Sequence, residues 1–301
     1  MSRIREPLRE RFSIAQTMRI GHASLNVSDI QRSVDFYRDI LGFNVVGRPS
    51  DEKAFLSTSG GSHLVELLQA TNPMHDTIQQ KKRAGLYHFA VLLPERKYLA
   101  DMLQNLRDNR DKVHFDGLAD HLVSESIYIR DPDFNGIEIY CDRPSSEWRW
   151  NGSQVEMATI GLDTENLLQE STSFGWKEMP TGTTIGHVHL HVQNLAKAMN
   201  FYHEILGLNL TATVPNAAFF AAGRYHHHIA TNTWLGTDIA PASPNSVGLN
   251  HYSIELSNKK QLDDTIENLS KHNIELQEQS EESNSVMLHD NDGIAIQLYS
   301  R

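Results

Sequence analysis

Two glutamates in apolar segments and an unusual number of histidines are the residues best suited to chemistry. Glu66 lies in HLVELL and Glu138 in GIEIY, so each carboxylate interrupts an otherwise apolar, strand-like run. A lone buried carboxylate is costly, and a bound divalent cation removes that cost. The chain also has 16 histidines, and neutral imidazole is the commonest metal ligand. These residue types together favour a metal site.

An internal repeat places some of the histidines at matching positions. The segment GHASLNV at 21–27 matches GHVHLHV at 186–192, and FY with LG at 36–42 matches the same pattern at 201–207. The offset is 165 in both cases, because 187 − 22 and 201 − 36 are equal. The two halves of the chain therefore share one plan, with His22 and His187 at equivalent positions.

The repeat unit is predicted to be a βαβββ module. In the first module, the alternating IGHASLNV indicates a strand, and a helix follows with Ser28 as its N-cap and Gly42 at its end. GLYH at 85–88 and GLNH at 248–251 open the second and fourth modules, and the third begins at 185. The other expected elements of the first two modules are strands at 44–47, 53–57, 63–68, 122–129 and 136–141 and a helix at 96–109.

Four such modules predict an α+β protein with two domains, each a cupped eight-stranded mixed sheet with helices outside. The expected boundaries follow the order of the modules. Residues 1–17 form an N-terminal arm, 18–142 the first domain, 143–184 a linker and 185–301 the second domain.

Composition argues against several classes of partner. The formal net charge of −11 disfavours nucleic acid, whose phosphates require a basic face. No apolar run approaches the ~20 residues of a membrane span, and the first residues lack the apolar region of a secretory signal. The single cysteine, Cys141, fits a reducing compartment. We therefore expect a cytoplasmic protein with no nucleic-acid or membrane partner.

Several of these segments resemble a known superfamily. The block GHASLNVSDIQRSVDFYRDILG and the turn–strand DPDFNGIEIY are similar to the vicinal oxygen chelate superfamily of glyoxalases, bleomycin-resistance proteins and extradiol dioxygenases. GLYHFAVLLP, DHLVSE at 120–125 and GHVHLHV with YHHHIATNTW look most like bacterial two-domain catechol 2,3-dioxygenase-like proteins. The resemblance covers all four modules.

The resemblance implies metal ligands on the first and last strands of paired modules. In the N-terminal half these positions are His22, Glu66, His88 and Glu138. Three of them, His22, His88 and Glu138, would form a facial triad of two histidines and one carboxylate, and Glu66 would complete a four-ligand site like that of glyoxalase I.

In the C-terminal half the implied ligand positions are His187, His228, His251 and Gln297. Gln297 departs from the glutamate of the family, and His228 is a candidate to compensate for it. His227 matches the acid–base histidine, and Tyr252 is a second candidate catalytic residue, expected to line the cup. Which half carries the active site stays open.

These features lead to one main functional hypothesis and two alternatives. The main hypothesis is cleavage of a small catechol-type aromatic by O₂ at a divalent metal, with Fe(II) expected, although the same donors suit Mn, Ni or Zn. One alternative is a glyoxalase-like isomerase or lyase that uses the N-terminal ligands. The other is a non-catalytic protein that binds a small molecule such as an antibiotic. A homo-oligomer is left open.

Overall fold

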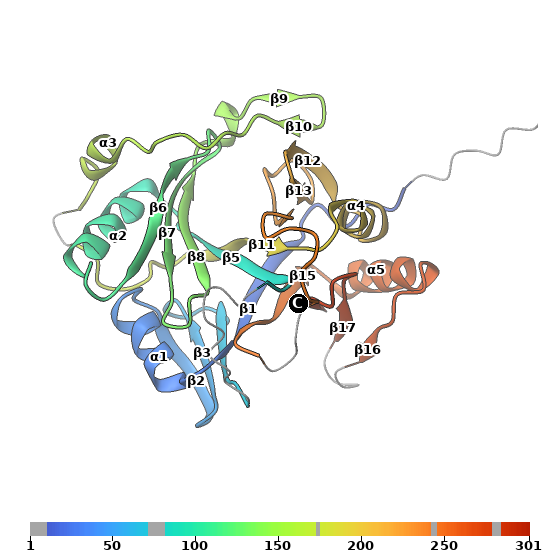
Figure 1. Ribbon diagram of the computed structural model, residues 1–301, viewed down its shortest axis with the longest axis horizontal. Helices are drawn as coiled ribbons and strands as arrows, with labels where there is room; N and C mark the ends of the chain where they lie inside the picture. Colours follow the sequence, from blue (N-terminus) through green and yellow to red (C-terminus); the bar gives the residue numbers. More distant parts are fainter. Residues whose placement is uncertain (1–10, 72–81, 173–174, 242–245, 279–283) are drawn as a thin grey trace, which may run out of the picture.

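Two eight-stranded mixed sheets form the framework of the molecule (Figure 1). The computed structural model describes residues 11–71, 82–172, 175–241, 246–278 and 284–301. Each sheet combines two βαβββ modules, which confirms the predicted α+β class and the four-module plan.

The first cup is the sheet built from the first and fourth modules. Its strands are β1 (Arg19–Val27), β2 (Asn44–Ser50), β3 (Lys53–Ser57), β4 (Val65–Gln69), β15 (Gly248–Leu256), β16 (Gln277–Glu278), β17 (Ser285–His289) and β18 (Ala295–Ser300). Their order is β16-β17-β18-β15-β1-β4-β3-β2. The two modules meet where β1 and β15 pair antiparallel, with Ser24 opposite His251.

The second cup is the sheet built from the second and third modules. Its strands are β5 (Gly85–Leu92), β6 (His114–Asp120), β7 (Ser124–Arg130), β8 (Gly136–Asp142), β11 (Thr184–His191), β12 (Asn209–Val214), β13 (Ala217–Ala221) and β14 (Ile229–Asn232). Their order is β12-β13-β14-β11-β5-β8-β7-β6. Here the modules meet where β5 and β11 pair antiparallel, with His88 opposite His189.

This pairing of modules corrects the expected domain composition. We expected consecutive modules to share a sheet within 18–142 and within 185–301, and that prediction is wrong. The outer two modules share one sheet and the inner two share the other. The physical reason is that all four modules offer a similar first strand as an edge, and the hydrophobic pattern fixes which face of that strand is buried but not which edge it joins.

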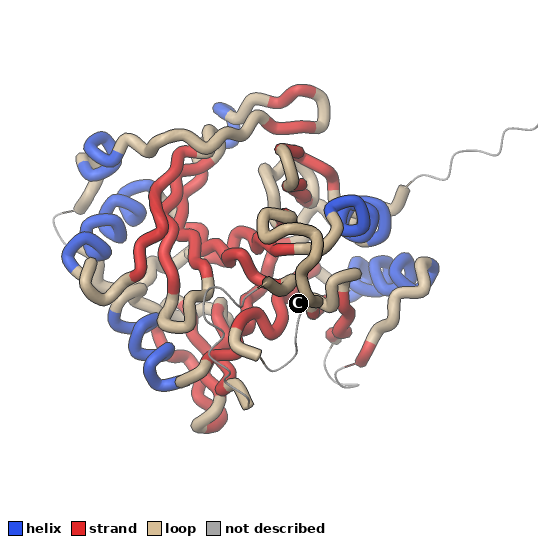
Figure 2. The backbone as a smooth tube through the Cα atoms, in the orientation of Figure 1, coloured by secondary structure: helices blue, strands red, loops and turns tan. Residues whose placement is uncertain are grey.

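Helices cover the outside of the sheets, as the tube in Figure 2 shows in blue around the red strands. They are α1 (Ile30–Asp39), α2 (Arg96–Asp108), α4 (Leu195–Met199) with the π-helical turn η2 (Asn200–Ile205), and α5 (Lys259–Lys271). The N-cap of α1 is Asp29, whose side chain accepts from the Arg32 amide, and not Ser28 as expected. Gly42 follows the helix with φ of +79°, as a helix-ending glycine should.

The segment expected to be a linker has short elements of its own. Between the second and third modules lie η1 (Ser145–Glu147), the two-stranded hairpin β9 (Trp150–Asn151) and β10 (Gln154–Val155), and α3 (Thr164–Leu168). No helix among the described residues has the length and apolar character needed to cross a membrane.

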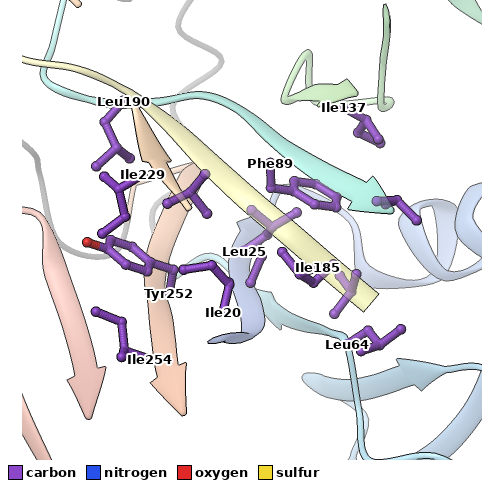
Figure 3. Close-up of a cluster of buried hydrophobic side chains, with 14 of the residues drawn as sticks. Ile20, Leu25, Leu64, Phe89, Ile137, Ile185, Leu190, Ile229, Tyr252 and Ile254 are labelled. Carbon is purple, nitrogen blue, oxygen red and sulfur yellow. The ribbon is translucent and has the colours of Figure 1, made fainter. Parts of the chain in front are cut away.

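One hydrophobic core joins both sheets (Figure 3). Strand alternation sends Leu25 and Tyr252 of the first sheet into this core together with Phe89 and Leu190 of the second. The same alternation sends the histidines of these strands to the opposite, concave faces. The fold therefore holds each group of polar residues on a strand whose other face is locked in the core.

Candidate functional site

The structure gathers the predicted ligands into two buried clusters, one in each cup. His22, Glu66 and His251 lie together in the first cup. In the second cup His88, Glu138 and His187 lie together. In both clusters a histidine and a glutamate come from one module and the second histidine comes from its partner module.

This grouping corrects the ligand sets expected from the resemblance. His22 and His88 lie in different cups, so neither the triad of His22, His88 and Glu138 nor the four-ligand set with Glu66 exists. His187 and His251 are likewise separated. The error has the same cause as the domain error, because we assumed that consecutive modules share a cup.

The second-cup cluster brings two imidazole nitrogens close to one carboxylate oxygen. Glu138 Oε2 lies 2.9 Å from His88 Nε2 and 3.0 Å from His187 Nε2. Two imidazoles and one carboxylate are a donor set that would suit a divalent ion such as Fe(II) or Mn(II).

The contacts of Glu138 leave one of its two carboxylate oxygens facing the histidines. Parallel pairing of β5 and β8 puts Glu138 beside Ala90, two residues beyond His88, so both side chains reach the same face. Ser126 Oγ donates to Oε1 at 2.6 Å and leaves Oε2 turned toward the histidines. Among the described residues, the ion pairs of Glu138 are with His88 and His187 alone.

Burial and neighbouring groups shift the pKa values of His187 and Glu138. Burial lowers the pKa of His187 to about 4, so its ring is neutral at pH 7 and keeps a lone pair. Burial alone would raise the pKa of Glu138, but the neighbouring His187 and His88 outweigh it and hold that pKa well below its usual range. His88 Nε2 is buried, and although it lies close to Glu138 it has no hydrogen-bond geometry to any partner. A divalent cation fits this site, because it would satisfy that nitrogen and neutralise the carboxylate.

A cavity of about 540 Å³ opens onto the second-cup cluster. Its wall includes all three members of the cluster together with apolar side chains from several strands. A larger cavity of about 870 Å³ adjoins it and shares Tyr87, Asp116, Arg130 and Trp234 as wall residues. The smaller cavity is lined by the second-cup cluster, and neither cavity is lined by His22, Glu66 or His251. We therefore place the reaction space in the smaller cavity, although the other is larger.

His227 lines this cavity, and a chain of hydrogen bonds sets its tautomer. Asp142 Oδ1 lies 2.8 Å from His226 Nε2, and a carboxylate accepts, so His226 carries its proton on Nε2. His226 Nδ1 then accepts from His227 Nδ1, which lies 2.8 Å away. The remaining His227 nitrogen, Nε2, is left with a lone pair. Its ring centroid is 4.1 Å from that of His187.

Tyr128 and His121 are functional candidates that the sequence analysis missed. His121 Nδ1 donates to the Ala158 carbonyl at 2.8 Å, so His121 Nε2 accepts from the Tyr128 hydroxyl at 2.7 Å. Both residues line the cavity, and Tyr128 lies directly opposite Glu138 in the β7–β8 hairpin. The signal was available, because the DPDFNG turn fixes that hairpin register and a residue opposite a ligand shares its face.

Two other expected site residues lie elsewhere. His228 accepts from the Ala222 amide at 3.2 Å and belongs to neither cluster. The true equivalent of Glu138 in the third module is Ala230, which pairs with His189, two residues beyond His187. Tyr252 points into the hydrophobic core, because its neighbour His251 faces the cup and adjacent strand residues face opposite ways (Figure 3).

Gln297 does occupy the equivalent position in the fourth module. It pairs with Ser253, two residues beyond His251, on β18 of the first cup. That cup also holds the cluster of His22, Glu66 and His251. In that cluster Glu66 Oε1 lies 2.5 Å from Lys53 Nζ.

Comparison with known proteins agrees with this architecture. The family model described as the Glyoxalase/Bleomycin resistance protein/Dioxygenase superfamily matches residues 19–139 and 184–298. Catechol-2,3-dioxygenase of Bacillus subtilis (strain 168) is 39% identical over 255 residues, which cover 83% of this chain and 87% of that protein.

Solved structures share the fold. A structure from Bacillus subtilis subsp. subtilis str. 168, described as a dioxygenase, superposes with a TM-score of 0.63 at 13% identity and covers 95% of this chain and 86% of that one. Glyoxalase I from Zea mays superposes with a TM-score of 0.55 at 15% identity, covering 94% and 92%. At these identities the likeness concerns the fold alone. The family model matches most of the chain, and the Bacillus subtilis relative is similar over 83% of it. The chain therefore belongs to the Glyoxalase/Bleomycin resistance protein/Dioxygenase superfamily.

Proposed function

We propose that this chain is a metal-dependent enzyme that cleaves the ring of a catechol-type aromatic with O₂, and that the second cup is its active site. The observation that carries the proposal is the triad of His88, Glu138 and His187, which opens onto a cavity of about 540 Å³. The relative named as a catechol-2,3-dioxygenase, which is similar over 83% of this chain, supports the same reaction class. Both oxygen atoms of O₂ enter the product, so the reaction needs no external reductant.

His88 Nε2, His187 Nε2 and Glu138 Oε2 would hold the metal ion, which we propose to be Fe(II), with Mn(II) suited to the same donors. When bound, this ion supplies a Lewis acid and a template with open positions for both catechol oxygens and for O₂. Ser126 keeps the second oxygen of Glu138 occupied and so helps to leave those positions open.

His227 is the proposed general base. Its Nε2 keeps a lone pair because Asp142 and His226 fix the proton on Nδ1. Burial lowers the pKa of His227 well below its usual value, so the ring is neutral before substrate binds. It can therefore take a proton from a substrate hydroxyl at Nε2.

Tyr128 and His121, which also line the cavity, are proposed to bind a substrate hydroxyl. The phenol donates to His121 Nε2, so its oxygen can accept a hydrogen bond from a substrate hydroxyl. Burial raises the pKa of Tyr128 well above its ordinary value and keeps the phenol protonated. The apolar residues of the wall, among them Leu118, Val123, Met157 and Phe219, would pack on the aromatic ring and exclude water.

The test compares the same substitution in the two cups. Wild type, Glu138→Gln and Glu66→Gln are purified without oxygen, and each is measured for bound metal and for ring cleavage of catechol and methylcatechols. We expect Glu138→Gln to lose metal and about 100-fold in rate, because one proposed ligand and its negative charge are gone. Glu66→Gln should keep both.

Each other outcome has a definite meaning. If Glu66→Gln loses the activity and Glu138→Gln keeps it, the active site is in the first cup. If the metal-loaded wild type cleaves no catechol, the ring-cleavage proposal fails. In that case turnover of a hemithioacetal would support a glyoxalase-like activity, and aromatic binding unchanged by chelation would support a binding protein.

A further inference from the structure

The two cups carry equivalent clusters that differ in the charge of one supporting residue. Glu66 lies beside Ser24, two residues beyond His22, just as Glu138 lies beside Ala90, two residues beyond His88. His251 and His187 complete the clusters from the partner modules. The register therefore superposes the ligands one by one.

The supporting position is Lys53 in the first cup and Ser126 in the second. Phe55 lies opposite Glu66 in the β3–β4 hairpin, and Tyr128 lies opposite Glu138 in the β7–β8 hairpin. Lys53 and Ser126 each precede that residue by two, so they occupy the same place on the same face. Lys53 Nζ lies 2.5 Å from Glu66 Oε1, and Ser126 Oγ lies 2.6 Å from Glu138 Oε1.

The difference between Lys53 and Ser126 changes the charge of the cluster. In the second cup Ser126 brings a hydroxyl, and the charge of Glu138 is left for another cation. In the first cup Lys53 brings a full positive charge to Glu66. A divalent ion bound there would lie within a few ångströms of the ammonium group, and the two cations would repel each other in a poorly solvated site.

The first-cup histidines also satisfy one another without a metal. His22 Nε2 lies 3.1 Å from His251 Nε2, so one proton between them makes a hydrogen bond. His22 Nδ1 bonds to Ser253 Oγ at 2.8 Å, and Asn250 Nδ2 lies 3.0 Å from His251 Nδ1. Every ring nitrogen of the pair therefore has a hydrogen-bond partner, whereas His88 Nε2 of the second cup approaches Glu138 without hydrogen-bond geometry.

We infer that the Lys53 ammonium takes the place of a metal ion in the first cup, so that the chain binds one metal ion and not two. The first cup is a metal site closed by its own lysine, and it opens to a divalent cation when that lysine is removed. The count of one rests on the metal site proposed for the second cup, but the closure of the first cup does not.

The experiment exchanges the two supporting residues and counts metal. Wild type, Lys53→Ser, Lys53→Arg and Ser126→Lys are stripped with a chelator, reloaded with Co(II) and measured for Co(II) per chain by elemental analysis. We expect one equivalent in wild type and in Lys53→Arg, two in Lys53→Ser, and none in Ser126→Lys. The second equivalent of Lys53→Ser should disappear again in Lys53→Ser/Glu66→Gln.

The gain of one equivalent of Co(II) in Lys53→Ser over wild type can be measured whether or not the proposed function is correct. If the second cup holds no metal, wild type reads zero and Lys53→Ser reads one, so the function fails while this inference stands. The inference is overturned if the His22→Ala variant binds less metal than wild type. It is also overturned if a folded Lys53→Ser variant binds no more metal than wild type. The His22→Ala arm needs no change at Lys53 and decides the question even if Lys53→Ser does not fold.

Discussion

At the scale of single residues, the proton on His227 is controlled from a distance. Asp142 lies outside the reaction cavity, with a side chain 23% exposed, and it reaches His227 only through His226. An amide at position 142 could donate to His226 Nε2 and reverse the chain. His226 would then donate from Nδ1, and His227 would carry its proton on Nε2, where the substrate needs a base.

We therefore predict that Asp142→Asn lowers kcat by about 100-fold, the usual contribution of a general base, with little change in KM. Metal content should stay that of wild type, because no ligand is touched. Tyr225→Phe is the matched control, since the Tyr225 hydroxyl donates to the other oxygen of Asp142 at 2.9 Å and has no effect on the tautomer. Equal kcat values for Asp142→Asn and wild type would remove His227 from the role of base.

The sequence predicts which residues are candidate ligands better than it predicts which of them lie together. Glu138 and His88 stand out because a buried carboxylate and a strand histidine in a repeat call for a common explanation. His187 joins them only through the pairing of β5 with β11 across a long stretch of chain. Tyr252, in contrast, could have been excluded from the sequence, because it cannot share the face of its neighbour His251.

At the scale of elements, two equivalent turns tie modules together that do not share a sheet. Asp131, in the turn before β8, accepts from the amides of Asp133 and Asn135 at 2.9 and 2.8 Å, from Asn135 Nδ2 at 2.8 Å and from the hydroxyl of Tyr37 on α1 at 3.1 Å. Asp290 repeats the arrangement with the hydroxyl of Tyr202 at 2.7 Å. Each carboxylate thus binds the helix of the preceding module.

We predict that Asp131→Asn lowers the free energy of unfolding by about 2–3 kcal/mol, because an amide turns a donor toward groups that all donate. Burial raises the pKa of Asp131 to about 6, so urea unfolding should be measured near pH 8, where the wild-type group is ionised in both the folded and the unfolded chain. Tyr37→Phe removes one of the four donors and should cost about 1 kcal/mol. A loss in Asp131→Asn no larger than in Tyr37→Phe would show that the turn contributes little.

Elements with strong periodicity or capping signals were predictable, and the others were not. The expected helix at 96–109 and strand at 53–57 agree with α2 and β3. β6 was missed because HFDGLAD lacks a clear alternation of apolar and polar residues, and its first three residues are exposed. The cap of α1 moved from Ser28 to Asp29 because Asp133 of the next module takes the Ser28 amide and hydroxyl, a contact that no local pattern contains.

At the scale of the whole molecule, each cup depends on both halves of the chain. β1 needs β15, and β5 needs β11, so each half on its own would leave two central strands as exposed edges. The second-cup triad is also divided, with His88 and Glu138 in one half and His187 in the other. Halves that look like complete domains in the sequence are therefore not independent units.

We predict that fragments 1–183 and 184–301 each fail to fold and to bind metal when produced alone, and that co-expression restores one metal equivalent in a complex of the two. Circular dichroism, size-exclusion chromatography and elemental analysis of the three preparations measure this. His187→Ala in the second fragment should abolish metal in the complex, because the triad then lacks the ligand that only this fragment supplies. A folded 1–183 fragment that binds metal and loses it on His22→Ala would instead mean that consecutive modules can share a cup, because His22 and His88 would then serve one ion.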